Sequence, residues 1–242
     1  MKKLALFFLL CLFSITLLAQ NFSLSGQTNF RTKYIGPNGL MFYKYPVNQS
    51  FITLAHNKTG LYFELWGSTG LKNGKTSWDD EVDYTAGIKN TIYPLSFDIS
   101  LSYFDNFDVF KGPKNDVVKG KINLSFPLDT VGWFKSSTYV NSTMFIVPSK
   151  HTTFNGGSLY SVGFESNISY SKINLVSLAQ LTWDDGAFDV KNGFLFKFST
   201  GLNYLISKHL TLNVFNVDAY LPLGKRGIPN QFVYSSGLSW NL

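Results

Sequence analysis

The sequence predicts an all-β chain that forms a single antiparallel transmembrane β-barrel of about 12 strands after a cleaved signal peptide. Three observations support this class. Apolar and polar residues alternate with a period of two along almost the whole chain after its first 20 residues, which is typical of strands with one apolar face. The connections between these stretches alternate between long and short, as in barrels that cross a membrane. The start of the chain is a separate apolar segment with a charged beginning.

The N-terminal segment has the composition of a secretory signal peptide. Lys2 and Lys3 form the charged beginning, an apolar run covers residues 4–18, and Ala19 is a small residue at the cleavage position. The run is shorter than the roughly 18 or more apolar residues that span a bilayer as a helix. We therefore expect residues 1–19 to be removed on export, and residues 20–242 to form one barrel domain.

Composition argues against several other classes of protein. The single cysteine, Cys11, lies in the segment that we expect to be removed, so disulfides and thiol chemistry are not expected in the mature chain. Only 15% of the residues are charged, whereas a soluble domain has about a quarter. The net charge of +6 is spread over many segments, so we expect no nucleic-acid partner. No later segment is apolar enough for a membrane helix, which leaves alternating strands to contact lipid.

The clearest alternation lies in residues 95–104. Leu95, Phe97, Ile99, Leu101 and Tyr103 share one face, and Asp98 shares the other face with serines. The first face suits hydrocarbon and the second suits water. Residues 61–66, 118–126 and 194–204 repeat this pattern. A soluble β-sandwich also has alternating strands, but the low charge and the alternating loop lengths favour the barrel.

The connections between strands give the strand count. Six are long, near 36–46, 70–80, 105–115, 148–157, 184–193 and 222–230. Tight turns near 56–60, 90–94, 171–172 and 207–208 separate them, and the stretch 127–136 is the irregular exception. Six long loops with five turns imply about 12 strands, with both ends of the mature chain on the side of the tight turns. Ten strands is the alternative count.

The last strand carries a pattern that points to a cellular location. Ser235, Gly237, Trp240 and Leu242 resemble the C-terminal strand that the assembly machinery of the bacterial outer membrane recognises, although the usual last residue is phenylalanine. We therefore expect this machinery to be a partner. Together with export and the barrel pattern, the C-terminal strand predicts the outer membrane of a Gram-negative bacterium, where outer-membrane lipid surrounds the barrel.

A series of short motifs follows in a fixed order between residues 29 and 107. They are Asn29, Phe30, Arg31 with Lys33 and Tyr34; then 46–49; then 60–62 with 65–68; then 81–84 with Gly87. In order and spacing they resemble the TorF-type porin family of Gram-negative outer-membrane barrels. The resemblance covers about the first third of the mature chain, and the second half is similar only in architecture. It implies a membrane barrel with a channel as its expected activity, and it implies no catalytic residue.

Extending the strand phase places a set of charged side chains on the inward face, because charges that face lipid are costly near the midplane. This set consists of Arg31, Lys33, Glu64, Glu81, Asp83, Lys89, Asp98, Lys119, Lys121, Glu165 and Lys197. One interpretation is a water-filled pore for passive, weakly selective diffusion of small polar solutes. The other is a salt-bridge network that fills a narrow, closed barrel with a structural or adhesive role for its long loops. Both produce the same alternation.

The long loops contain further charges. Two acidic runs, 78–81 and 183–186 with Asp189 nearby, lack the ligand spacing of a calcium loop, so we interpret them as solvated turns and expect no metal. The cations of the long loops would face lipopolysaccharide phosphates in the outer leaflet. They include Lys72, Lys75, Lys111, Lys114, Lys225 and Arg226.

The histidines argue against an enzyme. His56 and His209 lie at predicted turns and His151 lies in a long loop, so none is placed with a serine as a catalytic triad requires. We therefore expect neither catalysis nor a cofactor.

Overall fold

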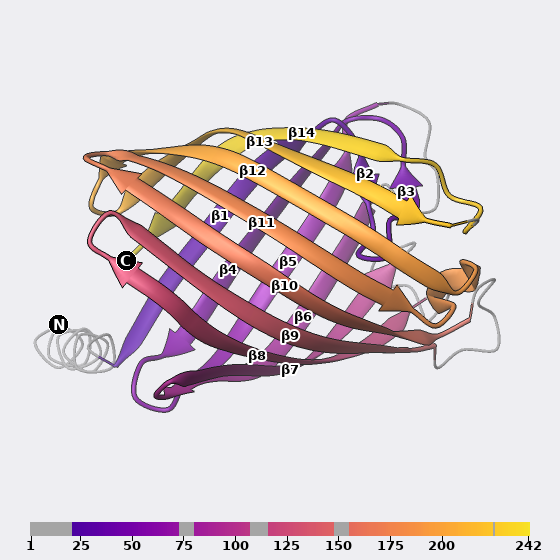
Figure 1. The fold of residues 1–242 in the computed structure, drawn as a ribbon, viewed down its shortest axis with the longest axis horizontal. Coiled ribbons are helices and arrows are strands. Elements are labelled where there is room, and N and C mark those ends of the chain that lie inside the picture. Colours follow the sequence, from indigo (N-terminus) through magenta and orange to yellow (C-terminus); the bar gives the residue numbers. More distant parts are fainter. Residues whose placement is uncertain (1–20, 73–79, 107–115, 148–154, 225) are drawn as a thin grey trace, which may run out of the picture.

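In a computed structural model of the chain, the described residues are 21–72, 80–106, 116–147, 155–224 and 226–242. Twelve antiparallel strands close into one barrel, with β1 (Phe22–Arg31) paired to both β4 (Val47–His56) and β14 (Gln231–Asn241) (Figure 1). The predicted all-β barrel with about 12 strands is confirmed, and the alternative of ten strands is wrong. The predicted signal peptide lies outside the described residues. Among those residues, no helix is long and apolar enough to cross a membrane.

The barrel strands are of unequal length, from 10 residues in β1, β4 and β5 to 15 in β8 and β12. Two short strands, β2 (Tyr34–Ile35) and β3 (Met41–Tyr43), form a separate hairpin between β1 and β4, and a 3₁₀ turn, η1 (Ala187–Asp189), follows β11. The barrel strands are β1 Phe22–Arg31, β4 Val47–His56, β5 Leu61–Gly70, β6 Asp80–Ile92, β7 Leu95–Asn106, β8 Val117–Val131, β9 Phe134–Ile146, β10 Gly157–Tyr170, β11 Ile173–Asp184, β12 Gly193–Ser207, β13 Leu210–Leu223 and β14 Gln231–Asn241.

Long connections lie at one end of the barrel and tight turns at the other, as the sequence predicts (Figure 1). The irregular stretch 127–136 contains the fifth tight turn. There β8 continues to Val131, β9 starts at Phe134, and a register shift between Pro127 and Asp129 disturbs the alternation. Strand β1 begins and β14 ends at the end with the tight turns.

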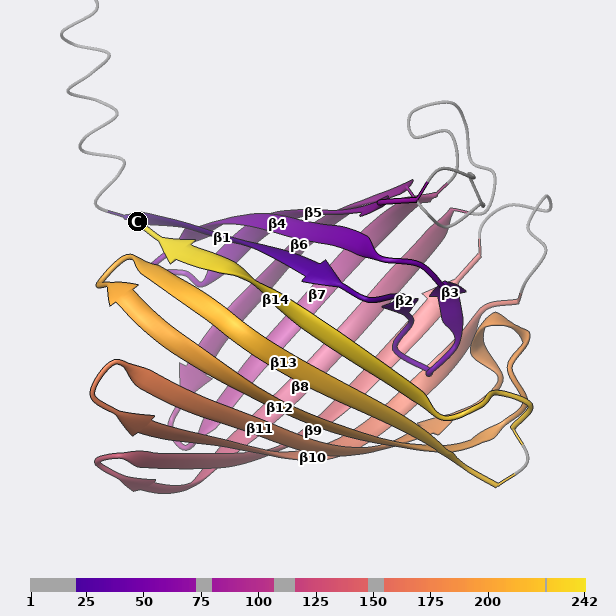
Figure 2. The same cartoon turned by 90° about the horizontal axis from the view of Figure 1, so that it is seen from above.

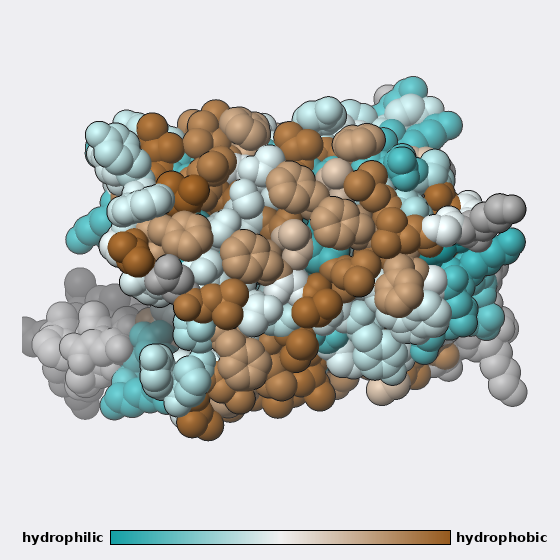
Figure 3. Space-filling model, in the orientation of Figure 1, coloured by the Kyte–Doolittle hydropathy of each residue, from teal (hydrophilic) through white to brown (hydrophobic). Residues whose placement is uncertain are grey.

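The outer surface of the strands is apolar. Ile99, Leu101, Ile122 and Val162 are among many large apolar side chains exposed on it, and hydrophobic residues gather over the middle of the strands while the loop end is hydrophilic (Figure 3). A soluble protein would bury side chains of this kind. The alternation therefore places an apolar belt outside and polar residues inside, which is the arrangement that a bilayer requires.

A charge on this belt is expected to prevent stable insertion. Leu101 lies near the middle of β7 and is 61% exposed on the outer face. Leu101→Arg would place a cation in hydrocarbon, at a cost of about 2–4 kcal/mol near the midplane, so the urea midpoint for unfolding from vesicles should fall. Asn123→Arg is the matched control because Asn123 lines the interior. Equal losses in the two variants would contradict the assignment of faces.

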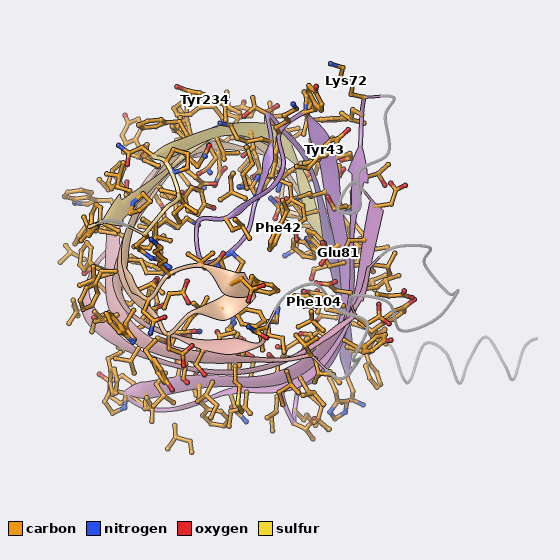
Figure 4. The ribbon with its side chains drawn as sticks, turned by 90° about the vertical axis from the view of Figure 1, so that its right-hand side faces the viewer. Phe42, Tyr43, Lys72, Glu81, Phe104 and Tyr234 are labelled. Atoms are coloured by element: carbon orange, nitrogen blue, oxygen red, sulfur yellow. The ribbon has the colours of Figure 1, made fainter. Side chains whose placement is uncertain are left out.

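The hairpin β2–β3 lies at the loop end of the barrel and turns inward across its mouth (Figures 2 and 4). The Asn38–Gly39 step makes the turn, with Gly39 at a φ of 84°, a left-handed conformation that glycine adopts without strain. Tyr34 and Tyr43 of this hairpin are buried together with Val47 at the start of β4, because the chain leaves the barrel wall after Arg31.

Candidate functional site

The barrel interior contains a polar cavity of about 700 Å³. Nine of the eleven charged residues predicted to face inward line it: Glu64, Glu81, Asp83, Lys89, Asp98, Lys119, Lys121, Glu165 and Lys197. Arg31 lines a second cavity of about 400 Å³ on the side of β12 to β14 and β1, among asparagine and serine side chains. Lys33, which follows β1, donates a hydrogen bond to Gln231 Oε1 at 3.0 Å. Ten of the eleven charged residues therefore line interior cavities, while their role in passing solutes stays a prediction.

A third cavity, of about 470 Å³, lies at the end with the tight turns, where His56, Asn57 and Gly60 line it. It shares four charged residues with the 700 Å³ cavity, namely Glu64, Lys89, Asp98 and Lys121. Two carboxylates and two amines thus surround the junction between the two spaces. Because the lining is shared, the polar interior extends from the turns up to the hairpin at the mouth.

Part of the interior charge is fixed in ion pairs. Lys121 Nζ lies 2.9 Å from Asp98 Oδ2, and the Tyr62 hydroxyl donates to Asp98 Oδ1 at 2.8 Å. On another part of the wall, Arg31 of β1 pairs with Asp218 of β13, two strands away, at 2.9 Å. Salt bridges therefore line parts of the wall, and cavities remain between them.

An apolar plug narrows the loop end of the barrel. Phe42 of the hairpin contacts Phe188 of η1 with ring centroids 5.6 Å apart, and Phe188 packs on Phe145 of β9 at 4.8 Å. Asn38 Nδ2 donates to the Ala187 carbonyl oxygen at 2.9 Å. We call the hairpin and η1 together the plug. Figure 4, viewed from this end, shows Phe42 inside the ring of strands.

A buried ion pair holds the plug in place. The guanidinium of Arg226, from the loop before β14, contacts the carboxylate of Asp184 at the end of β11, and both side chains are almost fully buried, at 1% and 0% exposure. Arg226 Nε also donates to the Lys191 carbonyl oxygen at 3.1 Å. Asp184 accepts from the backbone N–H groups of Gly186 and Ala187 at 3.0 and 2.8 Å. One pair therefore connects three segments of the loop end.

This geometry corrects two expectations from the sequence. Asp184 was expected in a solvated acidic turn, and Arg226 was expected to face the outer leaflet. Both are wrong, because each side chain is buried against the other.

Of the other charged residues in the long loops, some are described by the structure and some are not. Lys72 projects from the rim (Figure 4), with its Nζ 3.8 Å from the centroid of the Tyr45 ring. Lys75, Lys111, Lys114, Lys225, Trp78, Asp79 and His151 lie outside the described residues. A contact with lipopolysaccharide therefore stays a prediction.

Among residues 21–72, 80–106, 116–147, 155–224 and 226–242, no group of three or more His, Cys, Asp or Glu side chains is arranged to hold a metal ion. His56 Nδ1 lies 2.8 Å from Thr59 Oγ1, and His209 Nδ1 lies 2.8 Å from the Asn241 carbonyl oxygen. Both imidazoles are thus engaged locally at turns.

The apolar belt, the closed sheet and the polar interior define the class of this protein as an outer-membrane β-barrel. Comparison with solved structures gives the same class. The NanC porin aligns over 90% of this chain and 100% of its own, with a TM-score of 0.57 at 9% identity. The COG4313 outer membrane channel from Pseudomonas putida F1 aligns over 91% and 95%, with a TM-score of 0.54 at 10% identity.

A third similar structure is the translocator domain of the autotransporter NalP from Neisseria meningitidis, with a TM-score of 0.53 at 10% identity over 99% of this chain and 97% of that one. No protein-family model and no curated protein sequence matches the chain. At these identities the similarity shows the fold alone. Function is therefore inferred from the arrangement of the side chains.

Proposed function

We propose that the protein is a channel for passive, weakly selective diffusion of small polar solutes across the outer membrane. The observation that carries this proposal is the pair of polar cavities that share Glu64, Lys89, Asp98 and Lys121. A closed barrel with only a structural role is expected to fill this volume with packed side chains, as small barrels do. Similar structures that are named as a porin and a channel support the proposal.

Weak selectivity is proposed because charges of both signs line the main cavity. Five carboxylates and four amines belong to it, counted among the residues described. Rings of one sign produce strong preference for ions of the other sign. Mixed signs leave the average potential small, so both anions and cations are expected to pass.

Conductance in a planar bilayer tests the channel directly. Purified protein at 1 M potassium chloride is expected to give discrete current steps, with a reversal potential near zero in a salt gradient because selectivity is weak. A large reversal potential would contradict weak selectivity but not the channel. Persistent silence from protein that shows the heat-dependent gel shift of a folded barrel would contradict the channel.

The plug supports a second candidate, a closed barrel whose long loops are the working part. Phe42, Phe145 and Phe188 pack together across part of the mouth, and water does not enter a packed aromatic cluster. The two candidates differ in one measurable respect. If both the wild-type protein and a variant without the plug aromatics are silent in the bilayer, the closed barrel is the better description.

A further inference from the structure

Three inward side chains form a row across neighbouring strands near the plug. Asp83 of β6 is paired directly with Trp66 of β5 on one side and with Phe104 of β7 on the other. Directly opposite residues have Cβ atoms about 4.5–5.5 Å apart, so a carboxylate lies between two aromatic side chains. All three line the 700 Å³ cavity, and Figure 4 shows Phe104 on the inner wall near Glu81 and Phe42.

The carboxylate of Asp83 is incompletely satisfied. The residue is 8% exposed, and its Oδ1 is buried without a hydrogen-bond partner among the described residues. Its neighbour Glu81 differs, because Glu81 Oε2 accepts from the Tyr34 hydroxyl at 2.8 Å. Most buried polar atoms in folded proteins have a partner, so one without a partner requires an explanation. A donor carried by a ligand supplies one.

A cation already occupies one side of this row. Lys119 Nζ lies 4.6 Å from the centroid of the Phe104 ring, within the range of a cation–π contact. The charges of Asp83, Glu81 and Glu64 attract this ammonium group, and the charge of Lys121 repels it. Three acidic side chains therefore lie near two amines, so the local charge beside the row is negative although the average over the whole cavity is small. Among the described residues, no cation lies over the Trp66 ring.

We propose that Trp66, Asp83 and Phe104 form a subsite for the ammonium or guanidinium group of an organic cation that enters the barrel. The ligand cation lies against the Trp66 ring, as Lys119 lies against Phe104. It donates to the Asp83 carboxylate, whose buried Oδ1 must turn toward the cavity to meet it. A charge-assisted hydrogen bond and a cation–π contact both favour this class of solute over a neutral one. The proposal rests on the channel function, since the solute must reach the interior.

Calorimetric titration of the folded, detergent-solubilised protein tests the subsite with phenethylammonium as the probe and 2-phenylethanol as its neutral counterpart. We expect the wild-type protein to bind the ammonium probe and to show no saturable heat with the alcohol. Asp83→Asn should weaken ammonium binding by at least about tenfold, because the variant loses the charge-assisted hydrogen bond to the ligand. Trp66→Leu should weaken it by a smaller factor of about three.

Asp80→Asn is the matched control, because Asp80 lies on the same strand but is exposed and does not line the cavity. It should bind like the wild-type protein. Equal binding of the two probes, no ammonium binding by the wild-type protein at millimolar concentration, or an equal loss in Asp80→Asn and Asp83→Asn would overturn the subsite. If the protein conducts but does not bind the ammonium probe, the proposed channel stands and the proposed subsite is wrong. If the protein binds the probe but does not conduct, the subsite stands and the channel is wrong.

Discussion

Arg226→Ala is expected to release the plug and to lower the stability of the barrel by about 3–5 kcal/mol, the usual cost of removing one partner of a buried pair. The variant leaves the Asp184 carboxylate buried without its cation. It also removes the contact of Arg226 with the Lys191 carbonyl oxygen, so the segment after β11 loses its connection to the loop before β14. The urea midpoint for unfolding from vesicles and the temperature of the heat-dependent gel shift should both fall.

Lys121→Met is the control for this experiment. Lys121 also forms an ion pair, with Asp98, but the two side chains are 34% and 17% exposed. Solvent weakens such a pair, so its removal should cost about 0–1 kcal/mol. The double variant Asp184→Asn/Arg226→Ala should recover part of the stability, because the uncompensated charge is gone. If Arg226→Ala costs no more than Lys121→Met, the pair does not hold the plug.

The double variant Phe42→Ala/Phe188→Ala is expected to raise single-channel conductance several-fold. The two rings meet across the mouth of the barrel, and their removal leaves the hairpin and η1 without their shared apolar contact. Water can then enter the gap, because a hydrophobic constriction that is widened becomes wet. Current steps in planar bilayers should become larger at the same voltage. Buried phenylalanines are costly to truncate, so some loss of stability should accompany the opening.

Phe30→Ala is the matched control, since Phe30 lies near the same end of the barrel but is exposed on its outer face. It removes an aromatic ring without touching the plug, and its conductance should equal that of the wild-type protein. Unchanged conductance in the double variant, from protein that shows a normal gel shift, would contradict a plug that limits passage. An equal rise in Phe30→Ala would point to a general loosening of the barrel instead.

The sequence predicted the architecture well because period two and loop length are local properties. The outward face of β7 and the order of tight turns and long loops follow from neighbouring residues alone. The pattern of hydrophobicity does not identify the outer face of a strand whose inner face is also apolar, as in β11. Leu178 and Val176 line interior cavities, so both faces of β11 carry apolar side chains there. Alternation cannot decide between the faces in such a strand.

The plug could be predicted only in part. The Asn38–Gly39 pair is a known hairpin signal, so a turn within the first long loop can be predicted from the sequence. Its inward direction depends on partners that are distant in the chain, since Asn38 and Ala187 are 149 residues apart and Arg226 and Asp184 are 42 apart. No local pattern reports such contacts. Charged loop residues were therefore assigned to solvent although two of them pair in the interior.

The unequal strand lengths have a consequence for the surrounding bilayer. At about 3.3 Å per residue and a tilt near 45°, the 10-residue strands β1, β4 and β5 cover roughly 23 Å of membrane thickness, whereas the 15-residue strands β8 and β12 cover roughly 35 Å. A flat bilayer cannot match both walls, so lipid must thin beside the short strands or the barrel must lean toward them. Hydrophobic mismatch on one side thus gives the barrel a preferred orientation in the membrane.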